Sequence, residues 1–474
     1  MKKTLKDIIY NAIYQVFLIV LPLITIPILS RRIGADGLGV YGYVFSIAQF
    51  LMTVIAVGMN PFRIRNIAKA RDDKKELSMQ FWNIYFMQLL IGLGASIVYI
   101  MYIYLFDIQY KNLYFIQLIF ILGLTLDISW FFQGIEEFAK VVIRNTLIKI
   151  SSVFLIVLFV TTKDDLWIYV FITSITNFLG SLVFWLNIKG KVYRPKFNSA
   201  LFRKLWKPAF IILVPQLFMQ VYTTLDKTVV GYFVNPTELS YYDQSQKIAR
   251  IILAVLSSIT IVMLPKISKA QANGDKRNIL IYTKKSFDYT FIIAMILFSV
   301  VFVNTKEFVP WFFGEKFEPM VINMLLSCLL IIFSPIGGVF ANQFTIAIEK
   351  DKEFAYPMII GALISIVGNI LLVPKYGALG ATLVLVIVEF LVCFFRIFFI
   401  RDEIQVGYFF DKRINLFFVM GMALSLLFYY FVPTILNSSF LDMALKSIII
   451  VLVYLPITYF NFPHLKEEIS RMFK

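Results

Sequence analysis

Fourteen apolar segments follow one another through the chain, and each is long enough to cross a bilayer as a helix. The hydrocarbon core of a bilayer is ~30 Å thick, which an α-helix spans with about 20 residues. The segments are residues 8–30, 40–59, 81–106, 113–132, 141–160, 167–188, 208–234, 241–264, 287–303, 320–348, 354–373, 378–400, 414–435 and 441–460. The stretches between them are too short to bury a sizeable soluble core. The sequence therefore predicts an all-α polytopic membrane protein with about 14 transmembrane helices.

The positive charges follow the predicted loops and do not form a surface for nucleic acid. The chain has 45 Lys and Arg against 29 Asp and Glu, which gives a net charge of +16. With the N-terminus placed in the cytoplasm, most of these cations lie in the cytoplasmic loops and the two tails. An excess of Lys and Arg in cytoplasmic loops sets the orientation of membrane proteins. We therefore expect both termini in the cytoplasm and no binding of nucleic acid.

The residues on which catalysis most often depends are scarce. The single histidine, His464, lies in the C-terminal tail, and the two cysteines, Cys328 and Cys393, lie within predicted helices. Neither a histidine-dependent catalytic site nor a disulfide or metal framework can be assembled from them. No phosphate-binding loop motif occurs in the sequence either. The sequence predicts a protein that is not an enzyme and that needs no cofactor.

Short matching motifs indicate an internal repeat. Residues 67–70 (IAKA) recur as residues 267–270 (ISKA), each after the second helix of a predicted half. Many transporters consist of two repeats with the substrate bound between them. We expect an N-lobe of six helices over residues 1–188, a cytoplasmic linker over 189–207 and a C-lobe of six helices over 208–400. Two additional helices and the cytoplasmic tail follow over 401–474.

Polar and charged residues interrupt the apolar helices along single faces. Gln216, Gln220 and Lys227 recur at helical spacing in the seventh segment, and Asp243, Lys247 and Arg250 do so in the eighth. A charged side chain at the centre of a membrane helix costs about 2.5–3.5 kcal/mol, so these faces avoid lipid. We predict that they line a hydrated, basic cavity between the lobes. The predicted substrate-binding residues are Arg31, Asn145, Lys149, Gln216, Gln220, Lys227, Lys247 and Arg250.

Simpler roles stay open for several of these residues. Polar side chains on membrane helices often bond one helix to another, and Arg31 can extend to the lipid headgroups from the outer end of the first segment. Glu389 lies two turns from Arg396 on one helix face, which favours a buried structural ion pair. The carboxylates that are candidates for binding a coupling H⁺ or Na⁺ are Asp127, Asp226, Asp243 and Glu389.

Three segments resemble a known family of transporters. Residues 127–138 (DISWFFQGIEEF) with 143–145 (IRN), residues 225–231 (LDKTVVG) and residues 311–317 (WFFGEKF) carry the resemblance. They are similar to the helix 4–5 region, the helix 7–8 signature and the outer loop after helix 9 of Wzx-like polysaccharide repeat-unit flippases. Those proteins belong to the multidrug/oligosaccharidyl-lipid/polysaccharide exporter superfamily. The resemblance extends over essentially the whole chain.

The resemblance implies a transport function in a bacterial plasma membrane. By this resemblance, the protein would carry an oligosaccharide repeat unit on undecaprenyl diphosphate from the inner to the outer leaflet, for a capsular or other surface polysaccharide. The sugar and diphosphate would cross in the basic cavity by alternating access, while the lipid tail stays in the bilayer. The expected partners are this glycan, the lipid bilayer and a polysaccharide polymerase. A teichoic-acid or peptidoglycan precursor is an alternative cargo, and a drug/cation antiporter is an alternative function.

Overall fold

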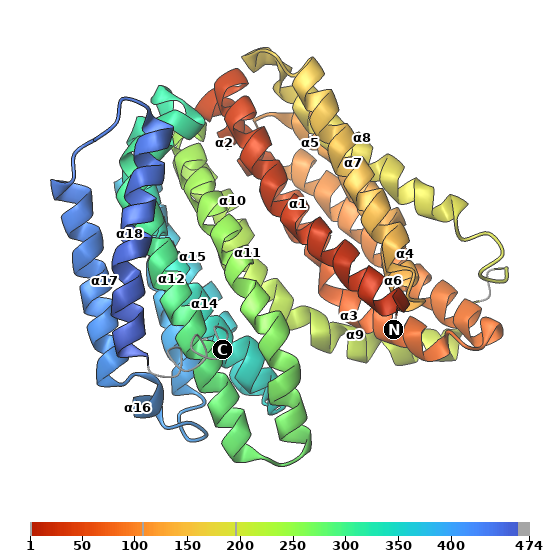
Figure 1. The fold of residues 1–474 in the computed structure, drawn as a ribbon. Helices are drawn as coiled ribbons and strands as arrows, with labels where there is room; N and C mark the ends of the chain where they lie inside the picture. The colour runs from red at the N-terminus through yellow and green to blue at the C-terminus, as the bar shows by residue number, and fades with distance from the viewer. Residues whose placement is uncertain (1, 107–108, 195–196, 463–474) are drawn as a thin grey trace. The chain divides into compact units, whose positions relative to one another are not determined.

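The computed structural model describes residues 2–106, 109–194 and 197–462, and within these ranges every regular element is a helix (Figure 1). The chain divides into two compact units, Met1–Ser240 and Tyr241–Lys474, hereafter unit 1 and unit 2. Unit 1 contains α1 (Lys2–Arg32), α2 (Gly34–Ile55), α3 (Asn60–Ala70), α4 (Lys74–Leu105), α5 (Lys111–Leu126), α6 (Ser129–Gly134), α7 (Phe138–Phe159), α8 (Leu166–Leu186), α9 (Ser199–Gln220) and α10 (Asp226–Phe233). Two short 3₁₀ turns, η1 (Val57–Met59) and η2 (Lys163–Asp165), and a π-helical segment, η3 (Val221–Leu225), connect some of them.

Unit 2 begins inside α11 (Pro236–Ala272). Its other helices are α12 (Lys276–Phe313), α13 (Val321–Ser327), α14 (Leu330–Gly338), α15 (Asp351–Phe398), α16 (Val406–Phe409), α17 (Lys412–Phe431) and α18 (Ser439–Asn461), with a 3₁₀ segment, η4 (Glu315–Met320), and a π-helical segment, η5 (Val339–Thr345). Unit 1 holds α9 and α10, which the sequence analysis assigned to the C-lobe. The predicted division into lobes stays a prediction.

The predicted membrane segments coincide with helices. Among the described residues, twelve helical stretches are long and apolar enough to cross a membrane. The longest of them, α15, contains two predicted segments and is broken at Gly377, whose φ of 56° and ψ of −138° are accessible mainly to glycine. Helix α1 coincides with the first predicted segment. The prediction of an all-α, multi-pass membrane protein is confirmed, whereas the count of fourteen stays a prediction.

One predicted loop is helical instead. Arg63 falls between the second and third predicted segments, where a cytoplasmic loop is expected, but it lies in α3 and is fully buried. Its guanidinium donates to the carbonyls of Ile55 and Ala56, at 2.5 and 3.4 Å. Carbonyls at the end of a helix lack partners within the helix, so the arginine satisfies groups that α2 leaves open. A count of loop charges could not detect this contact.

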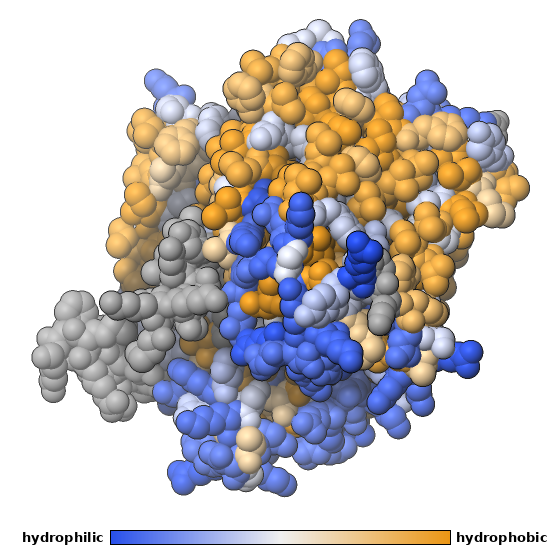
Figure 2. All heavy atoms as spheres, turned by 90° about the vertical axis from the view of Figure 1, so that its right-hand side faces the viewer, coloured by the Kyte–Doolittle hydropathy of each residue, from blue (hydrophilic) through white to orange (hydrophobic). Residues whose placement is uncertain are grey.

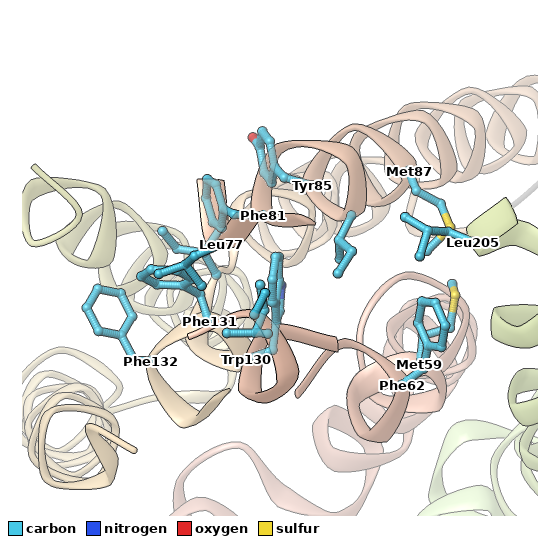
Figure 3. Close-up of a cluster of buried hydrophobic side chains, with 14 of the residues drawn as sticks. Met59, Phe62, Leu77, Phe81, Tyr85, Met87, Trp130, Phe131, Phe132 and Leu205 are labelled. Carbon is cyan, nitrogen blue, oxygen red and sulfur yellow. The ribbon is translucent and has the colours of Figure 1, made fainter. Parts of the chain in front are cut away.

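Aromatic rings form the core of unit 1 near the α5–α6 junction (Figure 3). Phe81 on α4 packs against Trp130 and Phe131, with ring centroids 5.6 and 4.9 Å apart. Phe132 stacks on Phe184 of α8 at 4.8 Å. Such ring pairs add specific geometry to apolar burial. The aromatic residues of the segment 127–138 therefore hold α4, α6 and α8 together.

The first part of the predicted linker 189–207 lies between α8 and α9 and is fastened to α4, whereas its last part, residues 199–207, is helical and begins α9. The Trp82 indole donates to the carbonyl of Tyr193 at 2.9 Å, and the backbone N–H of Tyr193 donates to the Ser78 hydroxyl at 2.9 Å.

Figure 2 shows one face of the molecule, with an apolar band above a region of hydrophilic side chains. An apolar band beside a polar end is the surface that a membrane-spanning bundle presents to lipid.

Candidate functional site

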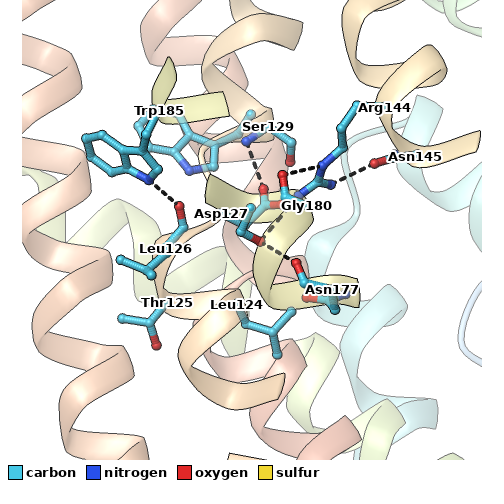
Figure 4. A network of polar contacts seen from close by, with 12 residues as sticks. Leu124, Thr125, Leu126, Asp127, Ser129, Arg144, Asn145, Asn177, Gly180 and Trp185 are labelled. Carbon is cyan, nitrogen blue, oxygen red and sulfur yellow. Dashed lines mark hydrogen bonds and ion pairs between the residues drawn. The ribbon is translucent and has the colours of Figure 1, made fainter. Parts of the chain in front are cut away.

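In unit 1, a polar site lies where α5 ends and α6 begins, at Asp127 (Figure 4). The last carbonyls of a helix need partners from outside the helix. Gln88 on α4 and Trp185 on α8 supply them. Their side-chain N–H groups donate to the carbonyls of Leu124 (3.0 Å), Thr125 (3.1 Å), Leu126 (2.8 Å) and Asp127 (2.8 Å). The helix can therefore break inside an apolar segment without leaving its carbonyls unsatisfied.

The side chain of Asp127 binds Arg144 on α7. The two groups form an ion pair at 3.0 Å, and their side chains are only 18% and 12% exposed. The guanidinium also donates to the Gly180 carbonyl at 2.8 Å and to the Ser181 hydroxyl at 3.3 Å, both on α8. Its remaining contacts are Asn145 Oδ1 at 2.7 Å and the face of the Phe184 ring, 4.5 Å from the ring centroid. Arg144 therefore links three helices.

This network lies within the membrane-spanning length of its helices. Asp127 and Arg144 are six to seven residues from the ends of their segments at Gly134 and Phe138, about 10 Å along a helix axis. The polar groups of Arg144 are occupied by protein partners, which is typical of a structural ion pair. The role of Asp127 in ion coupling stays a prediction.

Two predicted substrate-binding residues lie on α7 one turn apart. Asn145 accepts a hydrogen bond from Arg144 and so belongs to the network at Asp127. Lys149 lies in the middle of α7, about 16 Å from the start of the helix at Phe138. Its side chain is half-buried, and within the described part of the chain it forms no ion pair with a carboxylate.

The predicted face of the seventh segment contains a π-helical turn, η3, between α9 and α10. A π turn inserts about one residue relative to an α-helix, so the helical spacing of Gln216, Gln220 and Lys227 is not kept through it. Gln220 accepts a hydrogen bond from Thr224 at 2.6 Å, and Thr228 pairs with Ser46 of α2 at 2.5 Å. Thr224 in η3 thus bonds within its own segment, whereas Thr228 on α10 joins this segment to α2.

The other predicted residues of this segment differ in burial. Gln216 and Gln220 are half-buried, whereas Asp226 and Lys227 are 3% and 8% exposed. The Asp226 carboxylate accepts the backbone N–H of Lys227 at 2.8 Å, which places it at the start of α10. At the end of α1, Arg31 is exposed and donates to the Pro27 carbonyl at 3.1 Å. The neighbouring Arg32 donates to the carbonyls of Val157 and Val160 at 2.6 and 2.8 Å and so fastens the end of α1 to the end of α7.

In unit 2, predicted charges pair along α11. Asp243 is 1% exposed in its side chain and forms an ion pair at 2.7 Å with Lys247, whose side chain is 35% exposed. Arg250, one turn further, is exposed and donates to Gln246 at 3.2 Å. The structure thus brings together a predicted substrate-binding lysine and a predicted coupling carboxylate. The charges of Asp243 and Lys247 neutralise each other, and the functional roles of both residues stay predictions.

Glu389 on α15 interacts with two arginines. It accepts a hydrogen bond from Ser334 on α14 and interacts electrostatically with Arg396 and Arg250. No ion pair between Glu389 and Arg396 is present within 4 Å among the described residues, so the predicted pair stays a prediction. The interaction with Arg250 from α11 could not be predicted from the spacing along one helix. Among the described residues, no group of three or more His, Cys, Asp or Glu is arranged to hold a metal ion.

Several structurally important polar residues were missed by the sequence analysis. Gln88 and Arg144 organise the α5–α6 junction, and Lys446 on α18 binds both Glu307 of α12 and Asp442 at 2.9 Å. Arg144 lies within the segment that carried the family resemblance, which was a usable signal. Gln88 has no such signal, because a single polar residue in an apolar helix does not show which partner it binds.

Each unit therefore contains charged groups at membrane depth, most of them neutralised by protein partners. A cation that lies at this depth without a carboxylate partner is costly unless water or an anionic ligand compensates it. Lys149 in unit 1 has this property, and Arg250 in unit 2 is exposed within a membrane-spanning helix. Binding of an anion at these cations stays a prediction.

The chain is similar in sequence and in fold to several known proteins. The chain is 22% identical over 403 residues to a protein of Escherichia coli strain K12 named "Putative O-antigen transporter", which covers 84% of this chain and 97% of that protein. The structure of this chain resembles the inward closed conformation of the lipid II flippase MurJ, with a TM-score of 0.76 and 17% identity over 95% of this chain and 99% of that chain. It also resembles an inward-facing multidrug resistance MATE family transporter of the MOP superfamily, with a TM-score of 0.61 and 13% identity over 88% and 100% of the two chains.

These findings confirm the predicted resemblance to Wzx-like flippases and the prediction of a transport protein rather than an enzyme. The sequence pattern of the family described as "Polysaccharide biosynthesis protein" matches residues 4–271. That match includes the α5–α6 junction with Asp127 and Arg144, the central lysine of α7 and the whole of α9, η3 and α10. Because it covers more than half of the sequence, the chain belongs to the polysaccharide biosynthesis protein family.

Proposed function

We propose that the chain is a flippase for an undecaprenyl-diphosphate-linked oligosaccharide, moved from the inner to the outer leaflet during synthesis of a capsular or other surface polysaccharide. The family match over residues 4–271 carries this proposal. The alignment with nearly the full length of the O-antigen transporter relative supports it, because that protein is named for a surface polysaccharide. The flippase-like fold supports a movement between leaflets and not across an aqueous pore.

The central lysine of α7 supplies the physical link to an anionic headgroup. A diphosphate cannot enter hydrocarbon, whereas its lipid tail can remain there. Lys149 lies at the depth where the phosphates must cross and has no carboxylate partner in the described chain. Hydrogen bonds from a cation to phosphate are charge-assisted and stronger than neutral ones. Asn145, one turn away, can orient a sugar or phosphate oxygen beside it.

The same proposal includes the orientation and the driving force. With both termini in the cytoplasm of a bacterial plasma membrane, the basic loops lie inside, as the positive-inside rule requires. The membrane potential contributes about 2.3 kcal/mol per charge per 100 mV and favours outward movement of an anionic headgroup. The other predicted cavity residues, Lys227, Lys247 and Arg250, would assist alternating access, and a polysaccharide polymerase would receive the exported units.

Depletion of the protein in its host is the first test. Lipid-linked oligosaccharide should accumulate in the inner leaflet, and its sugars would identify the polysaccharide pathway. The accumulation is measured by extracting the lipids and comparing the glycan that is accessible from outside with the total. A host in which no lipid-linked glycan accumulates after depletion would exclude this function.

Substitution of Lys149 tests the site itself. Lys149→Ala removes a charge-assisted contact that is typically worth about 1.5–3 kcal/mol, so export should fall about ten- to hundred-fold. Lys149→Arg should retain most of the export, because it keeps the charge. The matched control is Lys375→Ala, an exposed lysine near the α15 kink. Normal export by Lys149→Ala at equal membrane abundance would remove Lys149 from the site.

A peptidoglycan precursor is the second candidate cargo, because the lipid II flippase MurJ shares the fold with a TM-score of 0.76. The same depletion distinguishes the two cargoes. Accumulation of the peptidoglycan precursor with arrested wall growth would favour this second candidate. Accumulation of a different glycan with intact walls would favour the first.

A further inference from the structure

A pocket of about 370 Å³ lies at one end of unit 1, away from the Asp127 network. It is formed where α4 ends and α5 begins, together with the start of α2, the end of α10 and the start of α11. Its lining includes four tyrosines, Tyr43, Tyr102, Tyr110 and Tyr232, and the amide side chain of Gln109. We call this site the tyrosine pocket. With the N-terminus in the cytoplasm, it faces the outer side of the membrane.

The pocket is built by close packing of backbone and rings. A Cβ atom on Gly39 of α2 would meet the carbonyl oxygen of Pro236 at 1.7 Å, so only glycine permits this approach. A Cβ atom on Gly231 would meet the Tyr43 ring at 2.4 Å. The ring of Tyr43 is therefore held against α10. A second layer of tyrosine supports it, since the Tyr114 ring lies edge-on to Tyr43 at 6.5 Å and tilted to Tyr102 at 6.1 Å.

The chemistry of the lining selects a class of ligand. Among the described residues that line the pocket, none carries a charged side chain. The walls combine aromatic faces with phenol hydroxyls, an amide and backbone groups, which suit a molecule with both apolar faces and many hydroxyls. A free phosphate or an inorganic ion would find no compensating charge there. The volume lies in the range of small-molecule sites, about 300–1,000 Å³.

We propose that the tyrosine pocket binds a neutral sugar ring of the transported glycan, beyond the first sugar of the chain. This inference rests on the proposed flippase function. The first sugar is attached to the diphosphate, which requires cations such as Lys149 and not an uncharged pocket. A ring further along the glycan is free of the diphosphate and can stack on tyrosine while its hydroxyls bond to Gln109 and the phenols. The pocket would then distinguish one repeat unit from another by a sugar beyond the first.

The competing explanation is that these tyrosines belong to the aromatic belt that anchors membrane proteins at the lipid interface. The chain offers a matched control for it. Tyr104 lies on the same end of α4 as Tyr102, is 73% exposed and does not line the pocket. Tyr232 in the pocket is 78% exposed, so its truncation should leave the fold intact. A belt residue and a pocket residue of equal exposure can therefore be compared.

The test uses the full-length protein in its depleted host with two lipid-linked substrates. One is the complete repeat unit on undecaprenyl diphosphate, and the other carries only the first sugar because the next glycosyltransferase is deleted. Tyr232→Ala and Tyr102→Ala should lower export of the complete unit about three- to ten-fold, as loss of one stacking or hydrogen-bonding contact does. Export of the single-sugar lipid should change less than about two-fold, and so should both exports in Tyr104→Ala.

The outcomes separate this inference from the function on which it rests. If the unsubstituted protein restores export of neither substrate, the flippase function fails and the inference fails with it. If it exports both, three results would overturn the inference alone. These are normal export of the complete unit by both pocket variants, an equal loss on both substrates, or the same loss in Tyr104→Ala. Membrane abundance of every variant is measured by immunoblot to normalise the rates.

Discussion

The two units neutralise their buried charges in different ways. In unit 1 the pair Asp127–Arg144 joins separate helices, and Glu137, in the loop after α6, joins the segment before α9 through Lys191 at 2.5 Å. In unit 2 three pairs lie four residues apart on single helices, namely Asp243–Lys247 (2.7 Å), Lys284–Asp288 (2.7 Å) and Asp442–Lys446 (2.9 Å). Lys446 also pairs with Glu307 on α12 at 2.9 Å, so this lysine keeps a partner on its own helix beside the one on another helix. A pair within one helix neutralises its charges whatever surrounds the helix. A pair between elements also fixes how the chain packs.

The loop carboxylate of unit 1 shows the effect of such a contact on a pKa. Burial raises the pKa of Glu137, but its hydrogen bonds and attraction to Lys191 and Lys140 outweigh the burial and hold the pKa below its usual value. The carboxylate therefore stays charged at neutral pH and keeps the loop attached. We expect the loss of an ion pair to cost more stability in unit 1 than in unit 2.

The largest effect should follow from Arg144→Met. Removing one partner of a buried ion pair typically costs about 3–5 kcal/mol, because the other charge is left uncompensated. Here the Gly180 carbonyl and the Ser181 hydroxyl lose a donor as well. The free energy of unfolding, measured by denaturant titration in detergent micelles, should fall by about this amount. An Arg144→Met protein as stable as the unsubstituted one would show that the junction between α5 and α6 does not depend on this network.

A smaller effect should follow from Glu307→Gln in unit 2. This change removes the ion pair between α12 and α18, whereas the hydrogen bonds Ser299–Tyr454 and Asn304–Ser447 still join the two helices. Lys446 stays paired with Asp442 on its own helix. Loss of a hydrogen bond to a charged group costs about 1.5–3 kcal/mol. The titration should show a loss in that range, below the loss in Arg144→Met. A loss as large as that of Arg144→Met would mean that pairing within a helix protects unit 2 less than we expect.

Asp243→Asn tests a pair that lies within one helix. Lys247 is 35% exposed and can turn toward water when its partner is neutral, so the expected loss is about 1 kcal/mol. Transport measured in the same variant gives a second result. Stability within this range together with lost export would make Asp243 a coupling residue. Normal export would leave it as the neutralising partner of Lys247.

The difference between contacts within one helix and contacts between elements also explains which features the sequence could predict. Helix positions followed from apolar runs, because each helix must cover the same bilayer thickness. The pair Asp243–Lys247 could be expected from its spacing, since residues four apart on a helix are neighbours. The π turn of η3 could not be predicted, and it changes which residues of α9 and α10 share a face. No periodicity in sequence signals one inserted residue in a turn.

Contacts between elements could not be predicted from the sequence for a related reason. Gln88 satisfies three carbonyls of the α5–α6 junction, and Arg63 satisfies the end of α2. Each is a single polar residue whose partner is a backbone group of another helix. Backbone carbonyls have no signature in the sequence, so only the fold shows which of them are open. The family resemblance marked the junction but not the residues that support it.

The smallest effect concerns Lys350 and Glu403, an exposed pair in unit 2 that joins two loops at 2.6 Å, with side chains 34% and 41% exposed. The hydrogen bond to Glu403 raises the pKa of Lys350, and the same bond lowers the pKa of Glu403 from its usual 4.5. A carboxylate with a lowered pKa stabilises the folded state above its unfolded pKa, and this contribution is lost as the pH falls through the folded pKa. The lysine contribution is present below about pH 10.5 and is lost as the pH rises through its higher folded pKa.

Glu403→Gln should therefore destabilise the protein by no more than ~1 kcal/mol between about pH 6 and 9, the usual limit for a surface pair. The difference from the unsubstituted protein should shrink below about pH 4.5, and unfolding titrations across this range would measure it. A difference that stays constant down to pH ~3 would show that Glu403 acts through packing and not through its charge.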